Sequence, residues 1–329
     1  MNLLLFKETD PIERLAKKWS LGIGEILNAK EQARLKREEF KQICEEQKLL
    51  TEDTSVVVFG SLARDEYTSG SDADWTLLID GGANADHFRV AQKIRSSIKG
   101  IFKEPNATGS FGGMTFSHPL IHNIGGPEDS NTNTTQRILL LLESRSIQGL
   151  GDAAYIRVLR GILNRYIEQE VSHLNRDKTG YKVPRFLLND VVRFWRTMAV
   201  DFASKQWARG GEGWGIRNAK LRFSRKLIYI SGLLTCFSCA LDPDLNSKIK
   251  PERDTALQVV NHLKSIKSPP LTVLASALLV YDTAGDASKL IFNAYNEFLA
   301  ILNDAKKTKA PSGSSGRGFT KRFSFYENS

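Results

Sequence analysis

The sequence predicts a mixed α/β (α+β) fold, in which a small mixed sheet follows N-terminal helices and precedes a bundle of helices. Two apolar runs, residues 55–60 and 74–80, have the length and β-branched content of buried strands, and a turn rich in Ser and Gly separates them. Charged segments with helical periodicity precede these runs. From residue 152 onward, apolar residues recur at helical spacing, which indicates a helical second half.

The length of 329 residues is enough for two domains with their own cores, and we expect four segments. They are N-terminal helices (1–50), a sheet-containing domain (51–150), a helical domain (151–304) and a basic, aromatic tail (305–329). Before residue 150 we expect helices at 9–20, 28–48, 84–99 and 131–145, and further strands at 114–117 and 120–124. Helix 84–99 should turn Phe88, Ala91, Ile94 and Ile98 inward. The later helices are expected at 152–170, 184–206, 213–240, 253–266, 270–281 and 284–304.

The stretch between residues 56 and 80 carries the strongest chemical signal. Gly60 and Ser61 end the first apolar run, and Asp72 and Asp74 open the second. Strand side chains alternate, so the two carboxylates should lie on one side, where they repel each other unless a cation separates them. Mg²⁺, or Mn²⁺ in its place, suits such oxygen ligands and takes others from substrate phosphates. A Gly-Ser turn next to them can offer N–H groups and a hydroxyl to phosphate oxygens.

With this spacing, Gly60-Ser61 followed by Asp72-Ala73-Asp74 resembles the motif of the DNA polymerase β-like nucleotidyltransferase superfamily. The resemblance implies a palm-like catalytic domain, a nucleoside triphosphate such as ATP as substrate, and Asp72 and Asp74 as catalytic metal ligands. It also implies a third carboxylate from a later strand, but strand 114–117 has no acid. The nearest substitutes are Glu128 and Asp129, so Asp129 is a candidate catalytic residue. Capping of the helix that follows is the alternative role.

Basic residues provide candidates for nucleotide binding. Arg64, one helical step beyond Ser61, is placed to neutralise charge on a leaving pyrophosphate. Residues 214–230 concentrate further cations on an otherwise apolar helix, and we expect them to face the carboxylates across a cleft. A solvated helix surface is the alternative. The candidates on this helix are Lys220, Arg222, Arg225 and Lys226.

The tail combines aromatic and basic residues. Residues 305–329 hold six basic side chains and one acidic one, more than half of the net charge of +9. Phe319, Phe323, Phe325 and Tyr326 lie beside Lys321 and Arg322, a composition that suits single-stranded nucleic acid. The Tyr326 hydroxyl is a candidate acceptor that would prime synthesis. Docking onto the protein itself, or contact within an oligomer, is the alternative.

Hydropathy and cysteine content indicate the cellular compartment of the protein. No apolar stretch reaches the length of a membrane span, and no signal peptide is expected, so we predict a cytoplasmic protein without membrane insertion. Three cysteines make no disulfide framework. The Cys236–Cys239 pair lies in an apolar helical run, where buried thiols are favoured over a metal or redox site.

Together these observations predict a metal-dependent nucleotidyltransferase, and the tail and basic helix favour a template-independent polymerase that makes oligonucleotides, DNA included. The layout resembles defence-associated bacterial enzymes, namely Hailong-type oligonucleotide synthases and, more distantly, cGAS-like cyclic oligonucleotide synthases. The resemblance implies a role in antiviral defence and an effector protein as partner. Three alternatives stay open: a cyclic oligonucleotide synthase, a protein-modifying enzyme of the uridylyltransferase type, and a non-enzymatic, antitoxin-like module that senses nucleotides.

Overall fold

The structure, a computed structural model, describes residues 10–47, 50–105, 111–148, 152–174, 183–208, 214–246 and 252–304. Its strands are β1 (Thr54–Val58), β2 (Trp75–Ile79), β3 (Gly113–Phe116) and β4 (Arg145–Ser146). The helices before residue 150 are α1 (Pro11–Trp19), α2 (Gly24–Glu46), α3 (Gly60–Ala63), α4 (Asp86–Ile98), α5 (Ser117–His122) and α6 (Asn131–Leu142). The later ones are α7 (Ala153–Leu174), α8 (Arg185–Ala208), α9 (Trp214–Lys220), the π-helix η3 (Leu221–Arg225), α10 (Lys226–Leu241), α11 (Pro243–Asn246), α12 (Glu252–Ser265), α13 (Pro270–Tyr281) and α14 (Asp286–Asn303).

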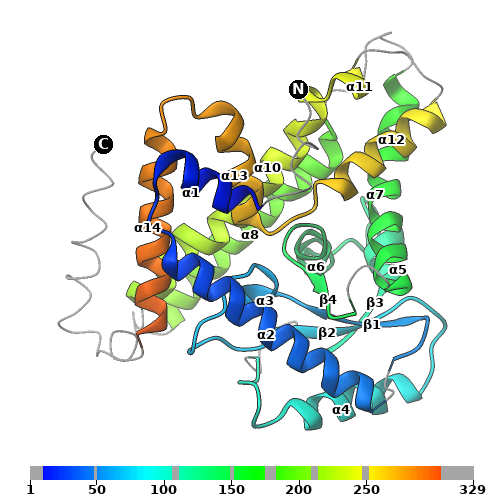
Figure 1. The fold of residues 1–329 in the computed structure, drawn as a ribbon. Helices are drawn as coiled ribbons and strands as arrows, with labels where there is room; N and C mark the ends of the chain where they lie inside the picture. The colour runs from blue at the N-terminus through cyan, green and yellow to red at the C-terminus, as the bar shows by residue number, and fades with distance from the viewer. Residues whose placement is uncertain are drawn as a thin grey trace.

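The four strands form one mixed sheet in the order β3-β2-β1-β4 (Figure 1). Strand β1 is antiparallel to both β2 and β4, and β2 is parallel to β3. Thr54 pairs with Ile79 and Val58 with Trp75, so the end of β1 and the start of β2 lie side by side. The turn after β1 and the segment before β2 therefore meet at one edge of the sheet.

Helices cover both faces of this sheet, which explains why every residue of β1 and β2 is buried. On one face, Val56, Val58 and Leu77 join a hydrophobic cluster with α2 and α4. On the other face, Val57 and Leu78 join a larger cluster with α5, α6 and α7. The alternation of side chains along each strand assigns neighbouring residues to different cores.

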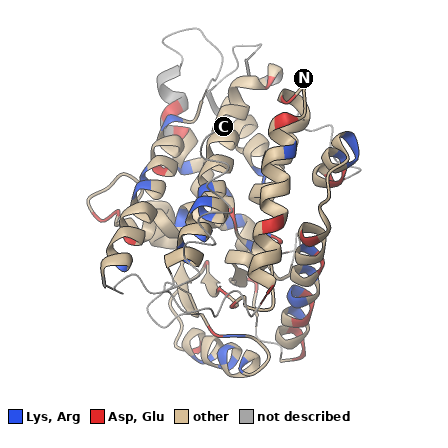
Figure 2. Ribbon diagram, turned by 90° about the vertical axis from the view of Figure 1, so that its left-hand side faces the viewer, with Lys and Arg blue, Asp and Glu red and all other residues tan. Residues whose placement is uncertain are grey.

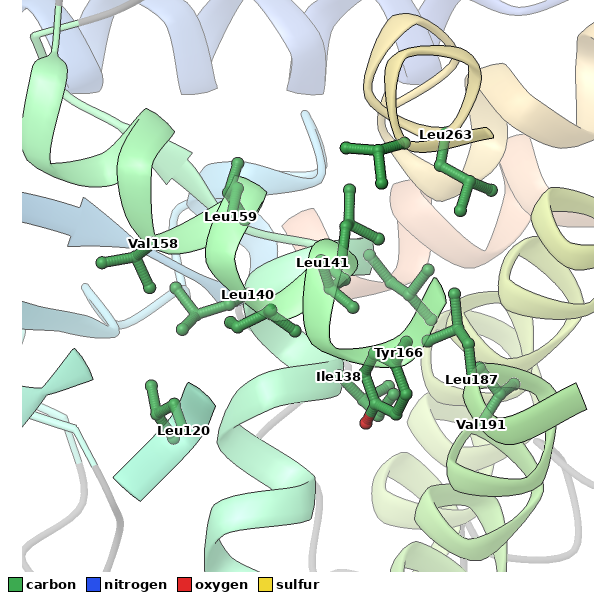
Figure 3. Packing of buried hydrophobic residues seen from close by; sticks show 14 of the residues in the cluster. Leu120, Ile138, Leu140, Leu141, Val158, Leu159, Tyr166, Leu187, Val191 and Leu263 are labelled. Carbon is green, nitrogen blue, oxygen red and sulfur yellow. The ribbon is translucent and has the colours of Figure 1, made fainter. Parts of the chain in front are cut away.

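The larger cluster continues from the sheet into the helical part of the chain. Figure 3 shows Leu140 of α6 packed near Val158 of α7, and Leu187 and Val191 of α8 near Tyr166. Because this core crosses residue 150, the sheet and helices α7, α8, α10 and α12 bury apolar surface together. The division at residue 150 into two domains stays a prediction.

The N-terminal helices pack against the C-terminal ones. Leu15 of α1 and Ile26 of α2 share a third hydrophobic cluster with Phe292 and Phe298 of α14. The side chain of Asn296 on α14 accepts hydrogen bonds from the backbone N–H groups of Glu25, at 2.9 Å, and of Ile26. These donors open α2 and have no partner within their own helix, so α14 supplies the cap that α2 lacks.

The predicted fold class is confirmed, and most elements match their predicted ranges. The strand expected at 120–124 is wrong, because this segment belongs to helix α5. Helix 131–145 ends early at Leu142, and the next residues form β4 because β1 offers them a free edge. The inward orientation of Phe88 is wrong as well: its exposed fraction is 60%, since it lies in the first turn of α4, ahead of the buried Ala91, Ile94 and Ile98.

Two further expectations concern the helices and the cysteines. Among the residues that the structure describes, no helix is long and apolar enough to cross a membrane. Cys44, Cys236 and Cys239 are buried free thiols, and burial raises the pKa of Cys239 to about 12. The interpretation of Cys236 and Cys239 as buried thiols agrees with this environment.

Helix α4 provides a paired test of this packing. Ile94 is fully buried, so Ile94→Ala should lower the free energy of unfolding by about 2–5 kcal/mol, through lost burial and the cavity left behind. Phe88→Ala, on the same helix but exposed, should change it by no more than about 0.5 kcal/mol. Urea denaturation followed by circular dichroism compares the two, and equal losses would contradict the arrangement of α4 on the sheet.

Candidate active site

The turn after β1 brings Gly60 against the carboxylate of Asp74. Gly60 has φ +61°, a left-handed conformation that favours glycine. A Cβ atom at this position would lie 2.6 Å from Oδ2 of Asp74. The N–H of Phe59 donates to the carbonyl oxygen of Asp74 at 2.9 Å, which extends the ladder beyond the strands. Only glycine therefore allows the turn and the carboxylate to lie this close.

Asp72 and Asp74 stand just before β2, which begins at Trp75, rather than within the strand as the sequence suggested. Between them, Ala73 is fully buried, and its N–H donates to the carbonyl oxygen of Lys103 at 2.9 Å. The alternation of a strand persists in this segment, so both aspartates line the same cleft. Burial, with the charges of Asp72 and Glu143, raises the pKa of Asp74 to about 7.

Glu143 is a buried carboxylate that the sequence analysis did not identify. It caps the C-terminus of α6, and its Oε1 accepts from the N–H of Gly60 at 3.3 Å. Its Oε2 accepts from Nη1 of Arg64 at 2.6 Å. A negative charge at a helix C-terminus is unfavourable because it opposes the helix dipole. An acid directly after the apolar run 138–142 was therefore the sequence signal that could have identified Glu143 as a site residue.

Arg64 lies between two buried glutamates. Its Nε donates to Glu66 at 2.9 Å, and its Nη1 donates to Glu143. Glu66 also accepts from the hydroxyl of Tyr295 on α14, at 2.5 Å, and from Ser224 of η3, at 3.1 Å. Burial lowers the pKa of Arg64, but the two glutamates raise it overall. Arg64 lines the cleft as expected, yet its charge is already balanced by the protein.

Cations from the helical part form the opposite wall of the cleft, whose volume is about 790 Å³. Lys220 and Arg225 line it together with Gly60, Ser61 and the two aspartates. Desolvation by the surrounding protein lowers the pKa of Lys220, against the attraction of Asp72. Burial also lowers the pKa of Arg225, and repulsion from Arg64 adds to the effect. The sequence analysis missed two further lysines of the cleft, namely Lys205 of α8 and Lys103, which lies beside the segment of the two aspartates.

The π-helix η3 determines which basic residues reach the cleft. In a π-helix the hydrogen bonds span five residues instead of four, which changes the positions that share a face. Lys220 and Arg225, five residues apart, both line the cleft. Arg222 and Lys226 are exposed and are not among the described residues that line it. The regular helical spacing assumed from the sequence grouped Arg222 with Arg225 and Lys226.

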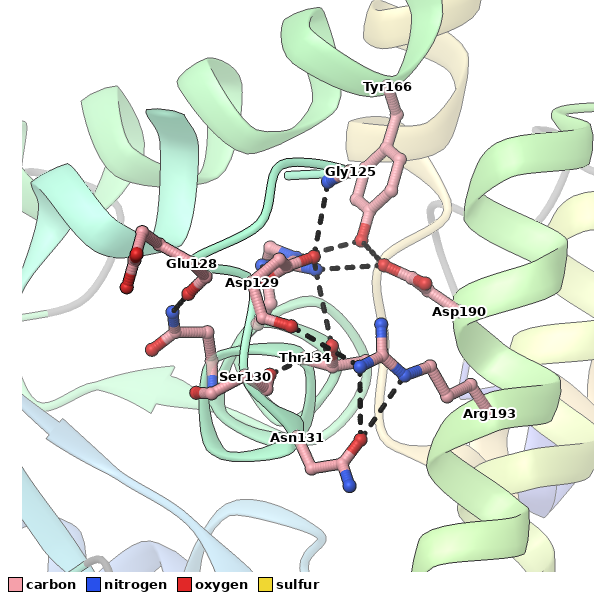
Figure 4. Close-up of polar contacts among 11 residues, drawn as sticks. Gly125, Glu128, Asp129, Ser130, Asn131, Thr134, Tyr166, Asp190 and Arg193 are labelled. Carbon is pink, nitrogen blue, oxygen red and sulfur yellow. Dashed lines mark hydrogen bonds and ion pairs between the residues drawn. The ribbon is translucent and has the colours of Figure 1, made fainter. Parts of the chain in front are cut away.

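Asp129 belongs to a different set of contacts (Figure 4). Its two carboxylate oxygens accept from Arg137, each at 2.9 Å. Arg137 is fully buried and also donates to Asp190 and to the hydroxyl of Tyr166. This network joins α6, α7 and α8, so the contacts of Asp129 are those of a structural ion pair, and Ser130 caps α6 instead. Tyr326 lies outside the described residues.

The residues of the cleft provide some of the ligands that a divalent cation needs. Within the described ranges, no group of three His, Cys, Asp or Glu side chains is placed to hold one metal ion. Asp72 and Asp74 nevertheless form a repelling carboxylate pair beside an open cleft, as the raised pKa of Asp74 records. A pair of this kind suits Mg²⁺, which often binds one or two carboxylates and completes its shell with phosphate oxygens and water.

The site joins two local features. A strand leads into a Gly-Ser turn, which lies next to an Asp-x-Asp segment that opens an antiparallel strand. Residues 37–104 match the model of the nucleotidyltransferase domain family. The match includes β1, α3, β2 and α4, and with them Gly60, Ser61, Asp72 and Asp74. No curated protein and no solved structure gives a significant match to the chain.

The repulsion at Asp74 predicts a stability that depends on pH. The folded protein holds the Asp74 proton up to about pH 7, while an unfolded aspartate loses it near its ordinary pKa of 3.8, so stability falls as pH rises through this window. Asp74→Asn should raise the free energy of unfolding of the metal-free protein by roughly 1–4 kcal/mol at pH 8 and by less at pH 5. Urea denaturation in EDTA measures both values, with exposed Asp86→Asn as the control. A gain that does not depend on pH would contradict the repulsion.

The contact between Tyr295 and Glu66 predicts a second effect. Tyr295→Phe removes one donor from a buried carboxylate and should lower the free energy of unfolding by about 1–3 kcal/mol. Tyr229→Phe is the matched control, because within the described residues the Tyr229 hydroxyl makes no hydrogen bond. Thermal denaturation compares the two variants, and equal melting temperatures would show that Glu66 does not depend on α14.

Proposed function

We propose that this protein transfers nucleotides from a nucleoside triphosphate to a hydroxyl group, and that it repeats the transfer without a template to build an oligonucleotide. One observation carries the proposal: the two walls of the cleft have opposite, unbalanced charges. Asp74 has a raised pKa on one wall, and Lys220 and Arg225 have lowered pKa values on the other. A cation bound together with a triphosphate would balance both walls at once.

The cleft suits each part of such a substrate. The Gly60-Ser61 turn is placed to offer a backbone N–H and a hydroxyl to the β- and γ-phosphates. Lys220 and Arg225 face that turn and would offset the charge of the leaving pyrophosphate. Phe111, Phe194 and Met198 line the same cleft and offer apolar surface to the sugar and base. Arg64 would support the turn through Glu143, which accepts from both, and its contact with pyrophosphate stays a prediction.

In the reaction, the oxygen of the acceptor hydroxyl forms a bond to the α-phosphorus. The bond from the α-phosphorus to its bridging oxygen breaks, pyrophosphate leaves with that electron pair, and the hydroxyl proton passes to solvent. Asp72 and Asp74 would hold Mg²⁺ or Mn²⁺, which supplies charge stabilisation to the phosphate oxygens. The protein itself orients the triphosphate between its two walls.

An oligonucleotide product is favoured by the cationic wall, since a growing product is a polyanion. Figure 2 shows Lys and Arg residues gathered in the middle of the molecule. Lys220 and Arg225 line the cleft. The basic, aromatic composition of residues 305–329 points to the same product. Priming by Tyr326, a role in antiviral defence, an effector partner and a cytoplasmic location stay predictions from the sequence.

The purified protein, incubated with each labelled ribo- or deoxynucleoside triphosphate and Mg²⁺ or Mn²⁺, tests the proposal. We expect a ladder of products that lengthens with time and that is lost in Asp72→Asn and Asp74→Asn. Lys220→Met should lower kcat/KM by about tenfold or more, because it removes a charge next to the phosphates. Exposed Lys226→Met, on the adjoining helix, is the matched control and should retain activity.

The form of the product separates the alternatives. A ladder that protease releases from the protein, and that Tyr326→Phe abolishes, would support priming by the tail. A short product resistant to phosphatase would identify a cyclic oligonucleotide synthase, and one nucleotide on another protein would identify a protein-modifying enzyme. Binding of triphosphate without any incorporation would overturn the proposal in favour of a sensing module.

A further inference from the structure

A second pocket, of about 440 Å³, lies beside the catalytic cleft; we call it the side pocket. Helices α2 and α14 form two of its sides, and the segments 67–71 and 101–103 form the others. Its volume falls in the range of small-molecule sites. Apart from Lys103, the side pocket holds none of the charged residues described for the cleft, so its lining requires a separate explanation.

The side pocket and the cleft share one wall. Thr68, Ser69, Ser71 and Lys103 line both of them. Ser71 immediately precedes Asp72, and the carbonyl oxygen of Lys103 holds the N–H of Ala73. A molecule in the side pocket therefore lies against the segment that carries the two aspartates. Lys103 is exposed at this wall, so its ammonium group can serve a phosphate on either side.

The remaining lining has the chemistry of a nucleotide site. Asn28 and Gln32, one turn apart on α2, present exposed amides to the pocket. In the described part of the chain neither amide makes a hydrogen bond. Amide side chains can pair with the edge of a base through a donor and an acceptor at once. Tyr67 adds a half-buried aromatic ring. Burial, and to a lesser extent the charge of Asp72, raises the pKa of the Tyr67 hydroxyl.

We propose that the side pocket binds the acceptor, a nucleoside or nucleotide whose hydroxyl attacks the triphosphate held in the cleft. The inference rests on the proposed function and names the second substrate. The bonds that form and break are those given above, and the new phosphodiester forms where the two pockets meet, at Ser71 and Lys103. Asn28 and Gln32 hold the base of the acceptor, and Lys103 lies beside its phosphate.

The test uses the full chain and a double variant, Asn28→Ala with Gln32→Ala. Both residues are exposed, so the substitutions leave the core intact. Gln42→Ala is the matched control, because Gln42 is an exposed amide of α2 that lines neither pocket. The four nucleoside 5′-monophosphates, each added as acceptor with a labelled triphosphate, serve as probes.

With the double variant we expect the KM for the acceptor to rise about tenfold, since the two lost hydrogen bonds together contribute roughly 1.4 kcal/mol. The KM for the triphosphate should stay within about twofold of the wild-type value. An acceptor KM equal to that of Gln42→Ala would overturn the side pocket while leaving the proposed function intact. A loss of triphosphate affinity instead would place both amides in the donor site and would also overturn it.

A binding measurement separates this inference from the proposed function. Calorimetric titration of a monophosphate into the protein in EDTA requires no transfer and no metal. We expect binding to the wild type and to Gln42→Ala, and about tenfold weaker binding to the double variant. Equal binding by all three proteins would overturn the side pocket. Failure of the proposed function has a different signature, namely no product from the wild type with any triphosphate.

Discussion

The pairing of Arg64 with two buried glutamates is the constraint on which the site depends. Glu143 joins this arginine to the turn at Gly60, and Glu66 joins it to Ser224 and Tyr295. A buried carboxylate without a partner is costly, so each member of the network holds the others in position. The sheet, helix α6, the π-helix and α14 thus converge on one guanidinium group, and the geometry of the cleft follows from that convergence.

Like charges lie close to one another in the cleft. Asp72 and Asp74 repel each other, and so do Arg64 and Arg225. Repulsion of this kind lowers the free energy of unfolding, and a substrate that supplies the opposite charges raises it again on binding. The structural ion pairs elsewhere differ, because Arg137 meets two carboxylates and a hydroxyl and needs nothing from outside.

The catalytic motif was predictable from the sequence because its parts are local. Gly60, Ser61, Asp72 and Asp74 lie within fifteen residues at the neighbouring ends of two adjoining strands, so local patterns were enough to bring them together. Glu143 and Tyr295 were not predictable, since they reach the site through β4 pairing and helix packing that no local pattern encodes. Arg222 and Lys226 were misplaced because a single π-helix changes the spacing, and a regular period cannot anticipate it.

The cap that Asn296 places on α2 has a consequence for how the protein is made. The first long helix of the chain and the buried Glu66 both take partners from α14, the last described helix. During synthesis on the ribosome the whole nucleotidyltransferase domain emerges before these partners exist. A nascent chain, or one truncated before α14, carries both aspartates and the Gly-Ser turn but lacks the hydroxyl that Tyr295 donates to Glu66. Synthesis of α14 is thus the step that supplies the last of these contacts.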